Sequence, residues 1–470
     1  MMDEALRERV RREIAESIGD DKVLHDKADL APYTKDTYRI RFEDEYRYFP
    51  DLVTLPESTE DVQRIVRIAA AHKVPLIPKG GGSSRTGMLV PISGGIVVDT
   101  IRMNRVVEVS VPDLYVTVQP GITLKDLESK LKDHGLALNQ EQGSFRVATV
   151  GGAIATSGFS RKHQKYGTIA DRVMSLEVVL ADGRVLRTGP KVLYTSTGYR
   201  LHQLFIGSEG TLGIITEATL RVEPVPEAKD QLLSFYPDFW AALEAAKKVM
   251  ASGVTFTGGE AFGTEHAADY GGPADRKAIF YLGFEGTKGE VEAQKRFVSK
   301  IIESTGGTLA RDEDASRFMQ RYTLQWCGAR ALTGYEDPLT SYVPIEKIRE
   351  FYEKLYGEIM PRYGISPIPG EEYSLDVGRY RILAARYLIP TEEGGWERFQ
   401  AMLKDIARLA TSLGGSISGC HGVGIQHRDN LWMEYSDVAL DVMRAVKKAF
   451  DPDNIMNPGK KIPDRNGRPS

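Results

Sequence analysis

The sequence predicts an α+β protein with two or three domains. Three features of the chain support this fold class: a strand–helix–strand pattern that ends in a glycine-rich loop near residue 80, a series of short β runs to about residue 222, and longer helices that alternate with strands from about residue 228. With 470 residues the chain is long enough to bury several cores. We expect an α/β part first and an α+β part with an antiparallel sheet after it.

The composition is that of an ordinary soluble globular protein. There are 61 basic and 65 acidic residues, for a net charge of −4, and this balance gives no electrostatic case for a nucleic-acid partner. Cys327 and Cys420 are the two cysteines, and without a CxxC pair they argue against an iron–sulfur cluster, a zinc knuckle or a disulfide framework. No apolar run approaches the roughly 18 residues of a membrane span. We therefore expect no transmembrane segment and a cytoplasmic location.

The first part of the chain leads into the glycine-rich loop. Residues 1–47 are predicted to be a helical segment, charged and amphipathic at its start. A strand is expected at 50–56, followed by a helix that Ser58 caps and whose apolar residues recur at helical spacing. The next strand, at 75–78, ends where the loop 79–87 begins, so the pattern delivers the loop to the carboxyl end of a strand.

The loop itself reads KGGGSSRTG. Successive glycines let the backbone approach a ligand closely and tolerate positive φ, so their N–H groups can converge on a phosphate or a pyrophosphate. Two hydroxyls and an arginine are available to complete such a cradle. The pattern is neither GxxxxGK[ST] nor GxGxxG, so it is not a Walker or Rossmann phosphate site, and a flexible surface turn is the alternative interpretation.

Strands and further glycine-rich segments follow the loop. The turn Pro120-Gly121 leads into a predicted helix at 124–134, and Asp182-Gly183 predicts a hairpin. The segment 142–158 is dense in glycine, serine and threonine and brings more backbone donors within reach of one ligand. The strands are expected at 95–99, 106–109, 115–119, 176–180, 184–188 and 218–222.

The pattern changes at 223–226, where two prolines break strand pairing. A buried strand is expected at 278–282. The tail carries the segment 414–424, which contains His421, and closes with 451–460. The expected helices of this part are 239–250, 288–304, 345–363, 396–413 and 437–450.

Five motifs, in order and at compatible spacing, resemble the FAD-binding flavoenzymes of the vanillyl-alcohol-oxidase type, most closely their D-lactate dehydrogenase and glycolate oxidase flavoprotein branch. The motifs are residues 80–87, 142–158, 166–167, 207–216 and 457–460. The resemblance implies a PCMH-type FAD-binding domain made of two α/β subdomains, plus an α+β cap. The implied division is an N-terminal helical segment 1–47, the FAD domain 48–226, a cap or substrate domain 227–413, and a C-terminal segment 414–470 that returns to the FAD domain.

The resemblance also implies which residues hold the cofactor. Residues 80–84 would bind the pyrophosphate, Glu209 and Ile215 would lie by the adenosine, and Asn457 near the isoalloxazine. Some relatives attach FAD covalently through a histidine beside the glycine loop, where this chain has serines, so the FAD is expected to be non-covalent. The expected cofactor-binding residues are Pro78, Lys79, Gly80, Gly81, Gly82, Ser83, Ser84, Thr86, Gly87, Met88, Pro120, Gly121, Gln142, Gly143, Ser144, Thr149, Val150, Gly151, Gly152, Ala155, Thr156, Ser157, Gly158, Glu209, Gly210, Gly213, Ile214, Ile215, His421 and Asn457.

Oxidation of a 2-hydroxy acid needs a base for the hydroxyl proton and a cation for the carboxylate. A neutral histidine suits the base, and His421 occupies the place of the family's active-site histidine; a loop histidine satisfied by backbone is the alternative. A guanidinium suits the carboxylate. Arg330 lies in a segment that resembles the family's tryptophan-to-arginine motif, with Arg379 and Arg381 as rivals and a solvated surface position as the alternative.

One segment departs from the family pattern. Close relatives carry His-x-Gly-Asp-Gly-Asn-x-His and a glutamate before the active histidine, and these bind a divalent metal. Here Tyr373 and Tyr380 replace the two histidines and Cys420 replaces the glutamate. Two phenols and a thiol make a poor zinc or manganese site, so no metal is expected. The tyrosines are candidates to donate hydrogen bonds to a substrate oxyanion, with aromatic packing as the alternative.

These residues together predict an FAD-dependent 2-hydroxy-acid dehydrogenase that acts on D-lactate or glycolate. Its electrons would pass to a separate acceptor, namely an iron–sulfur protein, an electron-transfer flavoprotein or a quinone, and a homo-oligomer is left open. One alternative is an alkyldihydroxyacetone-phosphate synthase-like flavoenzyme, which shares the fold but carries a run of histidines where this chain has His421 alone. The other is a flavin-carrying electron-transfer subunit of a complex.

Overall fold

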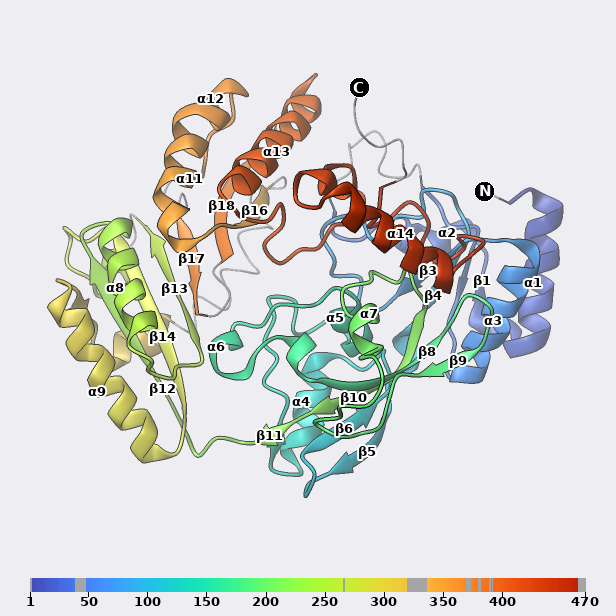
Figure 1. Ribbon diagram of the computed structural model, residues 1–470, viewed down its shortest axis with the longest axis horizontal. Coiled ribbons are helices and arrows are strands. Elements are labelled where there is room, and N and C mark those ends of the chain that lie inside the picture. The colour runs from blue at the N-terminus through green and yellow to red at the C-terminus, as the bar shows by residue number, and fades with distance from the viewer. Residues whose placement is uncertain are drawn as a thin grey trace. The chain divides into compact units, whose positions relative to one another are not determined.

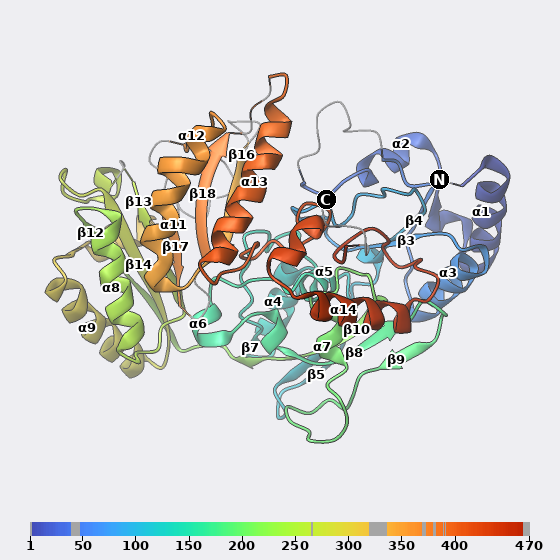
Figure 2. The ribbon, with the colours of Figure 1, turned by 45° about the horizontal axis from the view of Figure 1, so that its top comes forward.

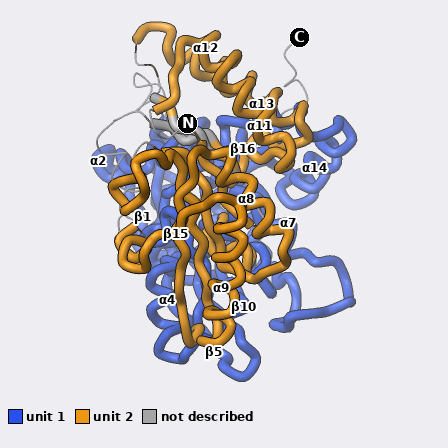
Figure 3. The backbone as a smooth tube through the Cα atoms, turned by 90° about the vertical axis from the view of Figure 1, so that its left-hand side faces the viewer, with its two compact units in different colours: residues 1–158, 168–225, 421–470 blue, residues 159–167, 226–420 orange. Residues whose placement is uncertain are grey.

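The computed structural model describes residues 2–38, 48–264, 267–318, 336–368, 373–378, 382–388, 390 and 392–463. The chain divides into two compact units (Figure 3). Unit 1 contains residues 1–158, 168–225 and 421–470, and unit 2 contains residues 159–167 and 226–420. The short segment 159–167 packs with unit 2, although it lies inside the range expected for the FAD domain. The division into four segments remains a prediction.

A four-stranded sheet forms the first part of unit 1 (Figure 1), with strand order β1-β2-β4-β3. Three of its strands are parallel, and β1 is antiparallel to β2. Helices α1 (Glu4–Ile18) and α3 (Thr59–His72) share one apolar core with this sheet. The strands are β1 (Val23–Leu24), β2 (Leu52–Thr54), β3 (Leu76–Lys79) and β4 (Ile96–Asp99).

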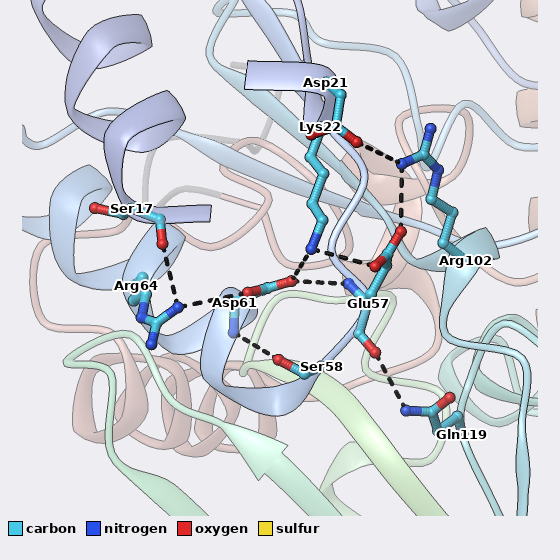
Figure 4. Close-up of polar contacts among 9 residues, drawn as sticks. All are labelled: Ser17, Asp21, Lys22, Glu57, Ser58, Asp61, Arg64, Arg102 and Gln119. Atoms are coloured by element: carbon cyan, nitrogen blue, oxygen red, sulfur yellow. Dashed lines mark hydrogen bonds and ion pairs between the residues drawn. The ribbon is translucent and has the colours of Figure 1, made fainter. Parts of the chain in front are cut away.

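The N-terminal segment contains more than the expected helices, because β1 adds an edge strand to the first sheet. Polar contacts join this segment to the start of α3 (Figure 4). Lys22 Nζ lies 3.0 Å from Asp61 Oδ2, and Arg64 Nη1 donates to the Ser17 carbonyl at 3.1 Å. The hydrogen bond to Asp61 raises the pKa of Lys22. As the sequence predicted, Ser58 caps α3, since its hydroxyl accepts the Asp61 N–H at 3.1 Å.

The second sheet of unit 1 is antiparallel, with strand order β5-β6-β10-β8-β9. Its strands β5, β8, β9 and β10 are labelled in Figure 2. The expected hairpin at 182–183 joins β8 to β9. Strand β10 begins at Ile214 rather than at residue 218, because Ile214 and Ile215 already pair with β8. The strands are β5 (Val106–Ser110), β6 (Tyr115–Val118), β8 (Val173–Val179), β9 (Val185–Arg187) and β10 (Ile214–Arg221).

Helices of unit 1 cover the second sheet through one apolar cluster. This cluster takes in buried residues of α4 and α5, and Phe205 of α7 contacts Phe450 of α14 with ring centroids 5.5 Å apart. The helices are α4 (Leu124–Lys132), α5 (Val150–Ala155), α7 (His202–Phe205) and α14 (Asp437–Phe450); α2 (Lys27–Leu30) lies in the N-terminal segment, and β7 (Leu136–Ala137) pairs with β11 (Glu223–Pro224).

Unit 2 is built on a seven-stranded antiparallel sheet, with order β15-β12-β14-β13-β17-β18-β16. Alternate residues of β12 face two different cores: Leu232 and Tyr236 belong to the cluster shared with the helices, and Leu233 and Phe235 to the opposite one. The strands are β12 (Ala228–Tyr236), β13 (Gly258–Gly263), β14 (Ala278–Gly286), β15 (Thr308–Leu309), β16 (Glu336–Tyr342), β17 (Ser374–Val377) and β18 (Ile382–Leu388); the helices are α6 (His163–Tyr166), α8 (Phe239–Ala251), α9 (Lys288–Ser304), α11 (Ile348–Lys354), α12 (Met360–Arg362) and α13 (Gly395–Ser412).

The helix expected at 345–363 is not regular. A π-helical turn at Leu355–Ile359 separates α11 from α12. Pro361 lies two residues after this turn, in α12. A proline has no N–H to donate and its ring clashes with the carbonyl four residues earlier, so a regular α-helix cannot run through this position without distortion.

Candidate functional site

The glycine-rich loop lies against segment 142–149. A Cβ on Gly80 would lie 2.2 Å from Thr149 Oγ1, and one on Gly81 would lie 1.8 Å from the Val147 carbonyl oxygen. Neither space admits a methyl group. The close approach therefore requires glycine at both positions, and it fixes where the loop amides lie relative to the start of α5.

Backbone donors are available in this loop. Within the described part of the chain, no group accepts a hydrogen bond from the backbone N–H of residues 80–83. Buried or partly buried N–H groups are normally satisfied, so a run of open donors at the end of a parallel strand indicates an anionic ligand. Two side chains of the loop are already engaged: Lys79 Nζ lies 2.7 Å from Asp99 Oδ2, and Ser84 Oγ donates to Asp36 Oδ2 at 2.6 Å.

Helix α5 forms the next part of the cradle. Thr149 caps it by accepting the Gly152 N–H at 3.3 Å. The Gly151 N–H donates to the Pro120 carbonyl at 2.8 Å, which brings the Pro120 turn against the helix. Several backbone donors of segment 142–158 are thus used within α5 or toward the Pro120 turn, a pattern that the glycine and threonine content did not reveal.

Gln142 lies beside the end of α5. A Cβ on Gly158 would lie 2.1 Å from its Nε2, so glycine makes room for the amide. This Nε2 is buried and has no hydrogen-bond acceptor among the described residues. A buried amide donor without an acceptor costs free energy unless a ligand completes it. Gln142 is therefore a further donor for a bound polar group.

The C-terminal segment that carries His421 is fastened to unit 1 at two places. Glu209 Oε1 accepts the Val423 N–H at 2.9 Å, and its Oε2 accepts the Gly424 N–H at 2.8 Å. Thr86 Oγ1 donates to the His421 carbonyl at 3.3 Å. These contacts place His421 in the same unit as the glycine-rich loop.

His421 is partly buried. Burial, together with the nearby positive charge of Arg85, lowers the pKa of its imidazole to about 3. The ring is therefore neutral at neutral pH. His427 is buried as well, and burial lowers its pKa to about 4. A neutral imidazole can accept a proton, which is the property that a base needs.

Asn457 joins three distant segments. Its Nδ2 donates to the Glu209 carbonyl at 2.7 Å and to the Met88 carbonyl at 3.1 Å, while its backbone N–H donates to the Leu76 carbonyl at 2.7 Å. Its Oδ1 is buried without a hydrogen-bond partner in the described chain. Lys460 lies nearby in sequence and donates to the Val90 carbonyl, and burial lowers its pKa to about 8.

Every residue expected to bind the cofactor lies in unit 1. The roles given to these residues remain predictions. Close packing and hydrogen bonds connect the loop with the 142–158 segment, and they connect Glu209 with the segment that carries His421 and with Asn457. Two further close approaches involve the glycines next to Glu209 and His421. A Cβ on Gly210 would lie 3.0 Å from Pro78 Cγ, and one on Gly422 would lie 2.3 Å from Met88 Cε.

The residues expected on the substrate side are less fully placed. Arg330, Arg379, Tyr380 and the rival Arg381 lie outside the described residues. Tyr373 lies in an aromatic cluster of unit 2: its ring is stacked on Phe239 at 5.2 Å and meets Tyr352 edge-on at 5.0 Å. This environment fits the packing alternative, and a role for Tyr373 in catalysis stays a prediction.

Neither a metal-holding group nor a membrane-spanning helix is present among the described residues. They contain no group of three histidine, cysteine, aspartate or glutamate side chains arranged to hold a metal ion. The prediction that the protein uses no metal rests on the sequence pattern alone. None of the described helices combines the length and the apolarity that crossing a bilayer requires.

The sequence did not show the contacts of three polar residues of the site. Arg85 belongs to the glycine-rich loop but was not singled out as the charge that acts on His421. Asp36 binds Ser84 and is buried, which raises the pKa of its carboxyl group. His427 is one of eight histidines in the chain, and no local pattern marks it as buried. Only the folded arrangement brings these groups together.

Comparison with known proteins shows the family to which the chain belongs. Residues 50–189 match the FAD binding domain, and residues 225–461 match the C-terminal domain of FAD linked oxidases. The chain is 32% identical over 434 residues to the glycolate oxidase subunit GlcD of Bacillus subtilis, covering 88% of this chain and 90% of that protein.

Two further proteins are similar over most of the chain. A D-lactate dehydrogenase of Archaeoglobus fulgidus is 33% identical over 420 residues, covering 87% of this chain and 91% of its own. The crystal structure of p-cresol methylhydroxylase with substrate bound superposes with a TM-score of 0.82 at 17% identity, covering 99% of this chain and 98% of the other, and shows a shared fold. The open loop amides and the unsatisfied Gln142 amide fit a dinucleotide with a pyrophosphate. The chain therefore belongs to the FAD-linked oxidases, and FAD is its cofactor.

Proposed function

We propose that the protein oxidises a D-2-hydroxy acid of the D-lactate or glycolate class and passes the electrons to a separate acceptor. The observation that carries this proposal is a neutral histidine, His421, attached to the same unit as the phosphate cradle. The relatives named glycolate oxidase subunit and D-lactate dehydrogenase support the substrate class.

The chain's own residues would hold the cofactor non-covalently. The backbone N–H groups of residues 80–83 would bind the pyrophosphate, and Gln142 would donate to a polar group of the ligand. Ser83 and Ser84 stand where covalently linked relatives carry a histidine. When bound, FAD supplies the hydride acceptor at N5 of its flavin ring.

His421 would take the hydroxyl proton as the substrate is oxidised. Its low pKa keeps the ring unprotonated, although it also makes the ring a weak base in the free protein. The positive charge of Arg85 contributes to that low value. A substrate carboxylate bound near Arg85 would offset this charge and raise the pKa of His421, so that substrate binding itself would strengthen the base.

The test is anaerobic reduction of the bound flavin, followed by its absorbance. We expect D-lactate or glycolate to bleach the flavin and L-lactate to leave it oxidised. Absence of bleaching by every hydroxy acid tried would contradict the proposal. Turnover of an acylated dihydroxyacetone phosphate with a fatty alcohol, without bleaching, would support the synthase-like alternative instead.

Replacement of His421 tests the base. His421→Ala should slow flavin reduction by roughly 10²–10⁴-fold, the range for loss of a general base, while FAD stays bound. Gly289→Ala, on the exposed start of α9, serves as the control, since its Cβ meets nothing within 4 Å. An unchanged rate in His421→Ala would remove this residue from the mechanism.

The acceptor is the second half of the proposal. The word subunit in the name of the Bacillus subtilis relative supports an acceptor on another chain. We expect the reduced protein to be reoxidised faster by a quinone analogue or an artificial dye than by oxygen. Fast reoxidation by oxygen with formation of hydrogen peroxide would show an oxidase and contradict this part.

A further inference from the structure

Glu209 is a buried acid that the proposed reaction does not use. It is 5% exposed, and its backbone has a φ of 55°. Left-handed φ is uncommon for a residue with a side chain and costs free energy. Gly207 and Gly210 on either side also have positive φ, so this turn is shaped to place the Glu209 side chain.

The backbone of Glu209 is held from two directions. Its N–H donates to the Ala155 carbonyl at 2.8 Å, at the end of α5. Its carbonyl accepts Asn457 Nδ2 at 2.7 Å. The residue is therefore fixed to the cofactor cradle on one side and to the chain's C-terminal segment on the other.

The Glu209 carboxylate binds the segment of residues 421–424. It accepts the N–H groups of Val423 and Gly424, and Lys461 Nζ lies 3.3 Å from Oε1. The fit is close, because a Cβ on Gly422 would lie 3.0 Å from Glu209 Oε1. Hydrogen bonds from backbone amides to a buried carboxylate are short and strong, so this contact fixes the segment rather than merely touching it.

We infer that Glu209 is the positioning residue for His421: its carboxylate holds residues 421–424 in place and thereby aims the imidazole. The inference rests on the proposed role of His421 as the base. Val423 follows His421 by two residues, so loss of the carboxylate contacts displaces the ring. Displacement of a reacting group by about 1 Å can cost on the order of a hundredfold in rate.

The experiment compares Glu209→Gln with Glu217→Gln. Glutamine keeps the shape of Glu209 but turns one acceptor oxygen into a donor that faces an N–H group. Glu217 lies on β10 in the same unit, where burial and the nearby Glu177 carboxylate raise its pKa. It makes no contact with segment 421–424 among the interactions described. Hydrogen–deuterium exchange of the peptide 420–427 and single-turnover flavin reduction are measured on both variants as holoenzymes.

In Glu209→Gln we expect the amides of this peptide to exchange at least about tenfold faster, which is the effect of losing one hydrogen bond to a charged group. Flavin reduction should slow by roughly tenfold to a hundredfold. Glu217→Gln should match the wild type in both measurements. Exchange in the β10 peptide reports whether each variant is folded, and Glu209→Asp replaces Glu209→Gln if the latter is not.

Unchanged exchange of peptide 420–427 in a folded Glu209 variant would overturn the inference. Faster exchange with an unchanged reduction rate would also overturn it, because the segment would then move without consequence for His421. If D-lactate and glycolate fail to reduce even the wild type, the proposed function fails. The exchange result still supports or overturns the role of Glu209 in holding the segment, so the two failures are distinguishable.

Discussion

Gly81→Ala is expected to weaken FAD binding by roughly a hundredfold. A Cβ at this position would lie 1.8 Å from the Val147 carbonyl oxygen and 2.8 Å from its carbon. Both are backbone atoms, so no side-chain rotation relieves the clash. Since close carbon–oxygen contacts occur at about 3.3 Å, the two segments would have to separate by roughly 1.5 Å.

This separation is large enough to break hydrogen bonds from the loop amides to a phosphate. A hydrogen bond to a charged group contributes about 1.5–3 kcal/mol. Loss of one or two of them costs about 3 kcal/mol, which corresponds to roughly a 150-fold increase in the dissociation constant. Movement of segment 142–149 instead of the loop would not restore binding. That segment contains Gln142 and leads directly into α5, so its movement would displace other parts of the proposed FAD site.

The assay is titration of apoprotein with FAD, followed by quenching of flavin fluorescence. Circular dichroism confirms that the variant is folded, and Gly289→Ala is the matched control, because its added Cβ meets open space. Gly81→Ala protein that binds FAD within about threefold of the wild type would refute the reasoning. It would show either that the loop does not bind the phosphates or that its amides tolerate the displacement.

Three further predictions concern stability. Burial holds the pKa of His427 at about 4, so only the unfolded chain takes up a proton at this residue as the pH falls below about 6.5. The free energy of unfolding should therefore decrease by about 1.4 kcal/mol per pH unit toward pH 4. His427→Leu should remove this part of the pH dependence, which denaturant unfolding at several pH values measures. Asp451→Ala should cost about 3–5 kcal/mol in urea unfolding, because the buried carboxylate pairs with Lys447 of α14 and accepts two backbone N–H groups at 2.7 and 2.9 Å. A loss no larger than that of Val438→Ala, a 74% exposed residue of α14, would contradict this. Ser58→Ala should cost about 1 kcal/mol by removing the cap of α3, and an unchanged thermal midpoint would be inconsistent with that cap.

Local signals in the sequence predicted individual elements well. The helix expected at 288–304 is α9, and its start is marked by Thr287 and Glu290, which form a capping box. The helix expected at 437–450 is α14, with Ser436 as its cap. In both cases the information lies within a few residues of the helix end, where side chains satisfy the first backbone N–H groups.

Contacts between distant segments could not be predicted in the same way. The sequence marks Glu209 as part of a glycine-rich motif, but not that its carboxylate binds the amide of Val423, which lies 214 residues further along the chain. It also gave no sign that β1 joins the first sheet or that residues 159–167 pack with unit 2. Such pairings depend on tertiary packing, which can place any strand edge or carboxylate beside a suitable partner. The family resemblance supplied the cofactor, but not these contacts.

The edge of the first sheet has a consequence for synthesis of the protein. Strand β3 pairs with the residues around Met456. The Leu76 N–H donates to the Ile455 carbonyl, and the Asn457 N–H donates to the Leu76 carbonyl, both at 2.7 Å. On the ribosome this edge stays open until nearly the whole polypeptide has emerged, and an open strand edge invites mispairing. We expect stalled nascent chains that end before residue 421 to bind chaperones through β3; equal capture of chains extended to residue 463 would show that the C-terminal residues do not protect this edge.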